Sequence, residues 1–361
     1  MPMIEDFGPI APYLASPDVS EIMVNGPGKI FIEQAGKLIQ LERRFPNEGE
    51  VLRVIRQLLA VSGKNLSPQM PLMDLRLNDG SRMTITMPPV TPVPSFTIRR
   101  PSFRTWDLLE LVKKGTMSAP MAEFLRLAIH LRLNMIIAGG TSTGKTTLLN
   151  AMAALIPRNT RIVTIEDTFE ISLPHPNWLQ METVYQGRGE KPIDTRDLVA
   201  HSLHLRPDRI ILGECRGGEA LDILQAMCSG HDGSMATIHA SSPRDALSRL
   251  ETMALMSGYE IPLLAIRQQI GRAIDMIVHM VRTPDGARLL SSVTAVSETE
   301  PGSIVVNDIY VLNRHPVSGR AEFRHTGFIP PFIEKAIADG VQIPATLFEG
   351  PPPSDSAIGA R

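Results

Sequence analysis

The sequence predicts an α/β protein with two domains, in which a smaller α+β domain precedes a larger domain built on a parallel β-sheet. Its 361 residues exceed what one hydrophobic core usually organises. Strand-like runs dominate the first 100 residues, whereas strand-like and helix-like segments alternate from residue 118 onward. That alternation is typical of a parallel sheet with helices on both faces. We therefore expect domains at 1–100 and 118–300, a linker at 101–117 and a C-terminal extension at 301–361.

The first domain is predicted from short apolar runs separated by turn residues. The turn Asn25-Gly-Pro-Gly28 separates the first two strands, and apolar residues at helical spacing predict a helix over 48–62. The expected strands cover 20–24, 29–33, 73–77, 82–86 and 96–100. Residues 101–115 contain one short helix candidate and are interpreted as part of the linker.

The second domain is predicted from apolar strands that each precede a helical segment. Its expected strands are 134–138, 161–165, 209–212 and 234–238. The expected helices are 147–155, 195–205, 217–228, 243–256 and 262–274. Strand-like runs follow near 276–282, 288–296 and 303–312, and the proline- and glycine-rich chain after residue 340 predicts an irregular end.

The composition excludes several classes of protein. A hydrophobic content of 43%, a charged content of 20% and a net charge of −2 are typical of a globular protein rather than a nucleic-acid coat. Only two cysteines occur, outside any C-x-x-C pair, so we expect neither a zinc site nor a disulfide framework. We see no signal peptide and no apolar run of about 18–20 residues that could span a bilayer. These observations predict a cytoplasmic protein.

The segment Gly139-Gly-Thr-Ser-Thr-Gly-Lys-Thr146 matches the phosphate-binding loop pattern GxxxxGK[ST]. Its glycines let backbone N–H groups turn toward phosphate oxygens, and the start of the following helix adds a favourable dipole. Lys145 supplies positive charge for the β and γ phosphates, and the Thr146 hydroxyl can bind magnesium. The predicted contacts with ATP and Mg²⁺ come from Gly140, Thr141, Ser142, Thr143, Gly144, Lys145, Thr146 and Thr147.

Carboxylates follow two other predicted strands. Glu214 ends the strand at 209–212, and Glu166 with Asp167 ends the strand at 161–165. Because the carboxyl ends of parallel strands meet at one edge of the sheet, these groups are expected near the γ-phosphate. Glu214 would orient or activate the attacking water, and Glu166 and Glu214 would hold magnesium through water. Alternatively, Glu214 caps the next helix, and the pair at 166–167 is a solvated strand end.

Histidine and arginine complete the candidate site. His239 ends the strand at 234–238 and is a candidate sensor of the γ-phosphate, while His231 in a turn is equally consistent with a structural role. Guanidinium groups stabilise phosphoryl-transfer transition states, and position favours Arg99, Arg206 and Arg216. Any one of them could instead form a surface or interdomain ion pair.

These motifs together resemble the traffic ATPases of type II and type IV secretion systems and type IV pili, and among them the CpaF/TadA-like branch of Tad pili. The resemblance rests on the phosphate loop at 139–147, an Asp box at 161–170, an atypical Walker B at 205–220 and a His box at 229–240. It extends to the N-terminal segments 19–26, 77–82 and 97–100 and to the tail at 323–348. The chain departs from the family in carrying Ser142-Thr143 where many members have Gly-Ser, which stiffens the loop.

The resemblance implies a RecA-like P-loop domain after a PAS-like N-terminal domain, arranged as a homo-hexameric ring. It implies roles for Lys145 and Thr146 on phosphate and magnesium, for Glu214 in catalysis, and for Glu166 and His239 as the Asp-box and His-box residues. Arg99 would reach the phosphates from the N-terminal domain. The implied partner is an inner-membrane platform protein, which would attach the motor peripherally to that membrane.

Two other hypotheses stay open at the sequence level. RecA-like rings also translocate nucleic acid, although the balanced charge and the lack of a basic, aromatic groove argue against that role. A non-hydrolysing ATP-binding scaffold is the other alternative, and the complete set of Lys145, Thr146 and Glu214 argues against it.

Overall fold

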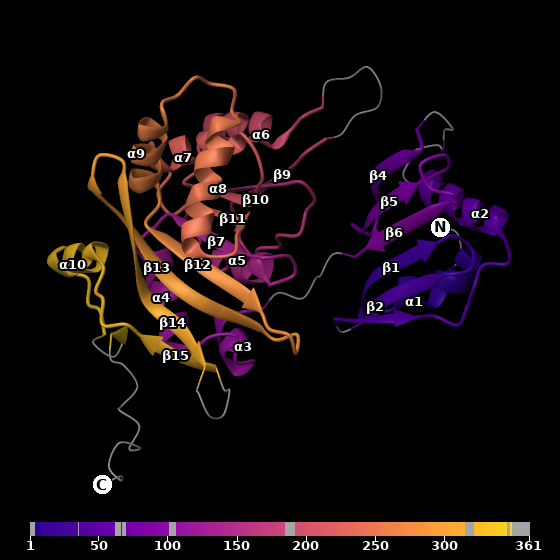
Figure 1. The fold of residues 1–361 in the computed structure, drawn as a ribbon, viewed down its shortest axis with the longest axis horizontal. Helices are drawn as coiled ribbons and strands as arrows, with labels where there is room; N and C mark the ends of the chain where they lie inside the picture. The colour runs from indigo at the N-terminus through magenta and orange to yellow at the C-terminus, as the bar shows by residue number, and fades with distance from the viewer. Residues whose placement is uncertain are drawn as a thin grey trace, which may run out of the picture. The chain divides into compact units, whose positions relative to one another are not determined.

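The chain divides into two compact units, Met1–Arg104 and Thr105–Arg361, in the computed structural model of the protein. Figure 1 shows the fold of both units. Each unit has its own hydrophobic core. The structure describes residues 4–34, 36–61, 66, 70–100, 106–184, 192–314, 321–344 and 347–348. Within these ranges, no helix is both long enough and apolar enough to cross a membrane.

The first unit is an antiparallel sheet with helices packed against it, as predicted for an α+β domain. The strands lie in the order β3-β2-β1-β6-β5-β4. Alternate residues such as Ile22 and Val24 of β1 are buried in one cluster with Val54 and Ile55 of α2, because successive strand residues point to opposite faces. The elements are η1 (Ile4–Ile10), α1 (Ala11–Ala15), β1 (Val19–Asn25), β2 (Ile30–Gln34), β3 (Lys37–Gln40), α2 (Glu48–Val61), β4 (Leu72–Arg76), β5 (Arg82–Thr86) and β6 (Ser95–Arg99).

The second unit is organised around a nine-stranded sheet in the order β15-β14-β13-β12-β7-β11-β10-β8-β9. The strands from β12 to β9 in this order pair in parallel, which confirms the predicted parallel core, whereas β13, β14 and β15 add an antiparallel end. The strands are β7 (Met135–Gly139), β8 (Ile162–Glu166), β9 (Trp178–Glu182), β10 (Arg209–Cys215), β11 (Met235–His239), β12 (Met276–Arg282), β13 (Arg288–Glu300), β14 (Ser303–Arg314) and β15 (Ala321–His325).

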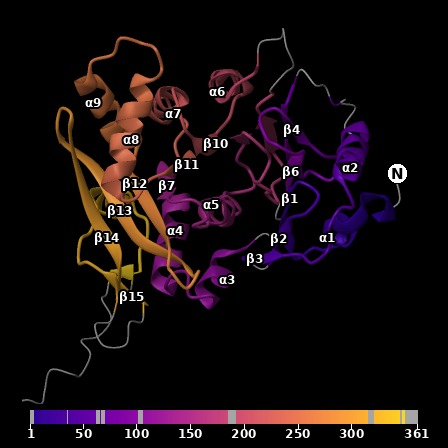
Figure 2. The same ribbon diagram turned by 45° about the vertical axis from the view of Figure 1, so that its right-hand side comes forward.

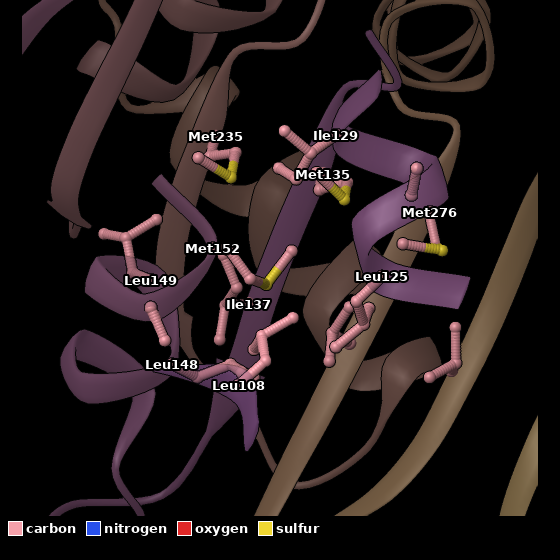
Figure 3. Packing of buried hydrophobic residues seen from close by; sticks show 14 of the residues in the cluster. Leu108, Leu125, Ile129, Met135, Ile137, Leu148, Leu149, Met152, Met235 and Met276 are labelled. Atoms are coloured by element: carbon pink, nitrogen blue, oxygen red, sulfur yellow. The ribbon is translucent and has the colours of Figure 1, made fainter. Parts of the chain in front are cut away.

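Helices cover both faces of this sheet. Met135 and Ile137 of β7 pack with α3, α4, α5 and α10, whereas Ile136 and Ala138 face α6, α7, α8 and α9. Figure 3 shows the first of these layers, where Met152 of α5 lies close to Ile137. The helices are α3 (Leu108–Lys113), α4 (Ala119–His130), α5 (Lys145–Ala153), α6 (Thr195–Ser202), η2 (Leu203–Leu205), α7 (Glu219–Cys228), α8 (Pro243–Leu255), α9 (Leu263–Ala273) and α10 (Pro331–Ala338).

The structure differs from the sequence-based expectations in several places. Leu108 and Leu111 of α3 are buried in the core of the second unit, so residues expected in a linker up to 117 are part of that unit. Residues 303–314 form β14, a sheet partner of β13, so they are no separate extension (Figure 2). The edge strand β9 was not predicted, because its residues are only partly buried and give no apolar run. The expected irregular end lies mostly outside the described residues.

Candidate functional site

The phosphate-binding loop connects the end of β7 to the start of α5 in the middle of the sheet. Gly139 tolerates no side chain, because a Cβ there would lie 2.5 Å from the Met280 carbonyl oxygen. Gly144 caps α5 with φ +96°, a left-handed conformation that favours glycine. Ser142 adopts φ +58° in the same region without being a glycine. Thr143 is buried and donates from Oγ1 to the Gly140 carbonyl oxygen at 3.0 Å.

Lys145 is held inside this loop. Its Nζ donates to the carbonyl oxygens of Gly139 at 3.1 Å and Gly140 at 2.8 Å. Burial lowers the pKa of Lys145 to about 8, and the nearby Glu214 carboxylate opposes that shift. A buried ammonium beside the N–H groups of a helix start fits a polyanion such as a triphosphate, which would offset the cost of burying the charge. Thr146 and Thr147 are half-buried in the first turn of α5.

Glu214, His239, Arg216 and Asp167 form one polar cluster beside the loop. Glu214 is near the end of β10, which lies between β8 and β11, and His239 ends β11 opposite Gly139 of β7. His239 Nε2 lies 3.0 Å from Glu214 Oε1, and Arg216 Nη1 lies 2.7 Å from Asp167 Oδ2. Arg216 also contacts Glu214. Burial lowers the pKa of His239, while Glu214 opposes the shift.

This cluster borders a cavity of about 420 Å³. Asp167, Glu214 and Arg216 line it on the sheet side, and Asp194 and Arg196 line it from α6 and the residue that caps that helix. Arg196 is itself fixed by an ion pair with Asp222, with 2.9 Å between Nε and Oδ2. The cavity therefore opens beside the carboxylate that the sequence marks as catalytic.

Glu166 lies at the end of β8 but serves a different set of contacts. Its Oε1 accepts hydrogen bonds from the backbone N–H groups of Glu170 and Ile171, both at 2.8 Å. Its Oε2 is buried and has no hydrogen-bond partner within the described part of the chain. Burial raises the pKa of Glu166 to about 7. Of the neighbouring carboxylates, Glu214 and Glu170 raise the pKa of Lys145.

The three arginine candidates lie in different places. Arg216 is in the cluster. Arg206 precedes β10 at the amino edge of the sheet, whereas the phosphate loop lies at the carboxyl edge, about 20 Å away at 3.3 Å per strand residue. Within one chain Arg206 therefore lies away from the loop, and its role at the phosphates stays a prediction. Arg99 belongs to the first unit, where its Nε lies 3.6 Å from Glu21 Oε1.

Asp167, which the sequence placed with Glu166 at a strand end, contacts Arg216 in the site. Two further residues beside the site were not among the candidates. His279 of β12 is buried, with Nε2 lying 3.3 Å from the carbonyl oxygen of Ala240, the residue after His239. Arg288 donates from Nε to the Ser142 carbonyl oxygen at 3.1 Å. The last two follow from the pairing of β12 with β7 and β13, which no local motif reveals.

Comparison with known proteins places the chain among secretion proteins. The sequence pattern of the family "Type II/IV secretion system protein" matches residues 3–315. Conjugal transfer protein TrbB of Rhizobium radiobacter is 35% identical over 276 residues, which are 75% of this chain and 82% of that protein. The VirB11 ATPase of the Brucella suis type IV secretion system, solved with sulphate, is 30% identical, with coverages of 80% and 92% and a TM-score of 0.45. The pilus retraction motor PilT, solved with ADP, shares the fold at 16% identity, with a TM-score of 0.56 and coverages of 81% and 82%.

Proposed function

The chain belongs to the type II/IV secretion system protein family, and we propose that it is a motor that hydrolyses ATP to power a secretion machine or a Tad-like type IV pilus. The observation that carries this proposal is the position of Lys145 in a phosphate-binding loop beside Glu214, His239 and Arg216. ATPases of secretion systems, VirB11 among them, are relatives of this chain. Binding of nucleotide is therefore expected from both the family and the loop.

Each residue of the site has a proposed part in hydrolysis. Loop N–H groups and Lys145 would bind the phosphates, and Thr146 would hold magnesium, with Glu214 reaching that ion through water. Bound magnesium neutralises charge on the β and γ phosphates. Glu214 would orient the attacking water, and His239, 3.0 Å from it, would hold the carboxylate in place. Arg216 would turn from Asp167 toward the γ-phosphate.

Glu166 is proposed to act on the phosphates indirectly, through the backbone and not by contact. It ties down the backbone at Glu170 and Ile171, so it fixes the segment that follows β8. This segment brings Glu170 close enough to Lys145 to raise the pKa of the lysine. We therefore retain a magnesium contact through water for Glu166 only as a secondary proposal.

The proposed working form is a homo-hexamer attached to the inner membrane from the cytoplasm through a platform protein. A ring allows the nucleotide state of one subunit to bias its neighbours, because ATP favours one arrangement of the two units and hydrolysis removes that preference. Arg99 is the proposed contact from the first unit to the phosphates.

The test is ATPase activity measured across a size-exclusion profile, with wild type compared to Lys145→Ala and Glu214→Gln. We expect magnesium-dependent phosphate release in a hexameric fraction, and a loss of about a hundredfold or more in each variant. Turnover unchanged in Glu214→Gln would support a non-hydrolysing scaffold with a contaminating activity. Salt-sensitive stimulation by DNA would instead favour a nucleic-acid translocase.

A further inference from the structure

The hairpin formed by β12 and β13 reaches the phosphate-binding loop. Met280 of β12 pairs with Gly139 of β7, so the last residues of β12 extend beyond the point where β7 ends. Arg282 and Arg288 then face each other across the hairpin. Both side chains are exposed, but only Arg288 has a hydrogen bond to the loop among the described contacts.

Arg288 forms one hydrogen bond to the loop, and its stem passes close to a second loop residue. Its Nε donates to the Ser142 carbonyl oxygen at 3.1 Å. The Cδ atom of its stem lies 3.4 Å from the place where a Cβ would stand on Gly144. The side chain thus spans the half of the loop that turns into α5, where the backbone N–H groups for phosphate are presented.

Ser142 has the least favourable backbone conformation for its residue type in this loop, so a contact that restrains its backbone matters most there. Its φ of +58° is left-handed, a conformation that costs free energy for any residue with a Cβ and little for glycine. The Ser142 side chain makes no hydrogen bond among those described, so its own hydroxyl does not stabilise the turn. A guanidinium bond to its carbonyl oxygen fixes the orientation of the peptide that joins Ser142 to Thr143, and so restrains the backbone of Ser142 on its C-terminal side. Hydrogen bonds from charged donors are the stronger kind.

We propose that Arg288 is a positioning residue for the phosphate-binding loop, which holds Ser142 in its left-handed conformation and thereby sets the affinity for nucleoside triphosphate. The inference rests on the proposed nucleotide binding. Arg288 would allow the loop to keep its phosphate-binding conformation although position 142 is serine and not glycine. Arg288 acts through the loop backbone, so its effect depends on which residue occupies position 142.

The test is a double-mutant cycle on the full chain with ATP and ADP binding measured by calorimetry, and with KM and kcat determined in parallel. We expect Arg288→Ala to weaken binding about tenfold when Ser142 is present, but about twofold or less in the Ser142→Gly background. The loss appears in KM, with kcat changed less, because the contact is to the loop. Arg282→Ala removes the same charge from the same hairpin rung and leaves binding within about twofold.

Three outcomes separate the possibilities. Equal losses in the wild-type and Ser142→Gly backgrounds would overturn the proposal, since Arg288 would then act on the nucleotide by charge alone. Unchanged affinity in Arg288→Ala would overturn it as well. Failure of the wild type to bind either nucleotide would instead remove the proposed function itself. Melting curves of all four proteins show whether each is folded, which we expect because both altered side chains are exposed.

Discussion

Two carboxyl groups at the carboxyl edge of the second unit's sheet lie in opposite environments. Glu166 is 3% exposed, and burial raises its pKa to about 7. Glu214 is more exposed and contacts Arg216 and His239. Gly213 permits this arrangement, because a Cβ there would lie 2.9 Å from Glu166 Cγ. Glu166 therefore holds the backbone that follows β8, whereas Glu214 faces the charged groups around Lys145.

The raised pKa of Glu166 predicts a pH-dependent stability. The folded pKa of about 7 lies above the ordinary value of 4.5, so the native state holds more protons than the unfolded state between these pH values. The free energy of unfolding therefore falls as pH rises from 4.5 to about 7, by about 2–3 kcal/mol. Glu166→Gln keeps the acceptor for the two backbone N–H groups and removes this loss. Urea denaturation at pH 5 and pH 8 measures the difference.

A surface substitution provides the control for that experiment. Glu300→Gln removes an exposed carboxylate from the end of β13 and should follow the wild-type pH dependence. Parallel curves for wild type and Glu166→Gln would show that Glu166 is ionised in the native state at pH 5, against the effect of its burial.

At the scale of helices, strands and loops, the sequence predicted the elements that are determined by residues a few positions apart. The loop at 139–146 and the apolar strand before it form where the pattern placed them, because glycines and buried runs act within a few residues. The burial of α3 and the pairing of β14 with β13 depend on contacts distant in sequence. The same holds for Arg288, which is 146 positions from Ser142 and has no motif around it. Residues that act across strand pairings were therefore missed.

The start of α8 gives a prediction at this scale. Ser242 accepts a hydrogen bond on Oγ from the Asp245 N–H at 3.1 Å, while Asp245 accepts from the Ser241 N–H at 2.7 Å. These bonds lie at the start of α8, whose N-cap residue, Ser242, is only three residues after His239. Ser242→Ala should therefore lower the free energy of unfolding by about 1 kcal/mol, because a helix N–H loses its partner.

The matched control for this prediction lies within the same helix. Ser248 is exposed in the middle of α8, where alanine is the better helix former, so Ser248→Ala should be neutral or slightly stabilising. Chemical denaturation of both variants decides the matter. Equal stabilities of the two variants would mean that the Ser242 cap adds nothing beyond the bond from Ser241 to Asp245.

The core of the second unit includes residues from α3 near its start and from the C-terminal segment. Tyr310 of β14 is buried and donates its hydroxyl to the Leu347 carbonyl oxygen, so residue 347 is attached to the core. Burial raises the pKa of Tyr310, which keeps the phenol protonated as the donor. Nucleotide bound at the loop is therefore expected to stabilise this entire unit against unfolding.

The first unit has a core of its own, and the proposed motor requires the nucleotide state to act on both units. We expect calorimetry of the unligated chain to show two unfolding transitions. ATP at about 100 times its Kd should stabilise by about 2.7 kcal/mol, which raises the melting temperature by roughly 5–11 °C for a unit of this size. If Arg99 links the first unit to the phosphates, both transitions rise in wild type, and Arg99→Ala leaves only the second responsive. Lys145→Ala should abolish both shifts.

The contradicting outcome is an unfolding temperature of the first unit that does not change when ATP is added to the wild type. That result would show that nucleotide does not bridge the units, and the coupled motion would then have to arise between subunits.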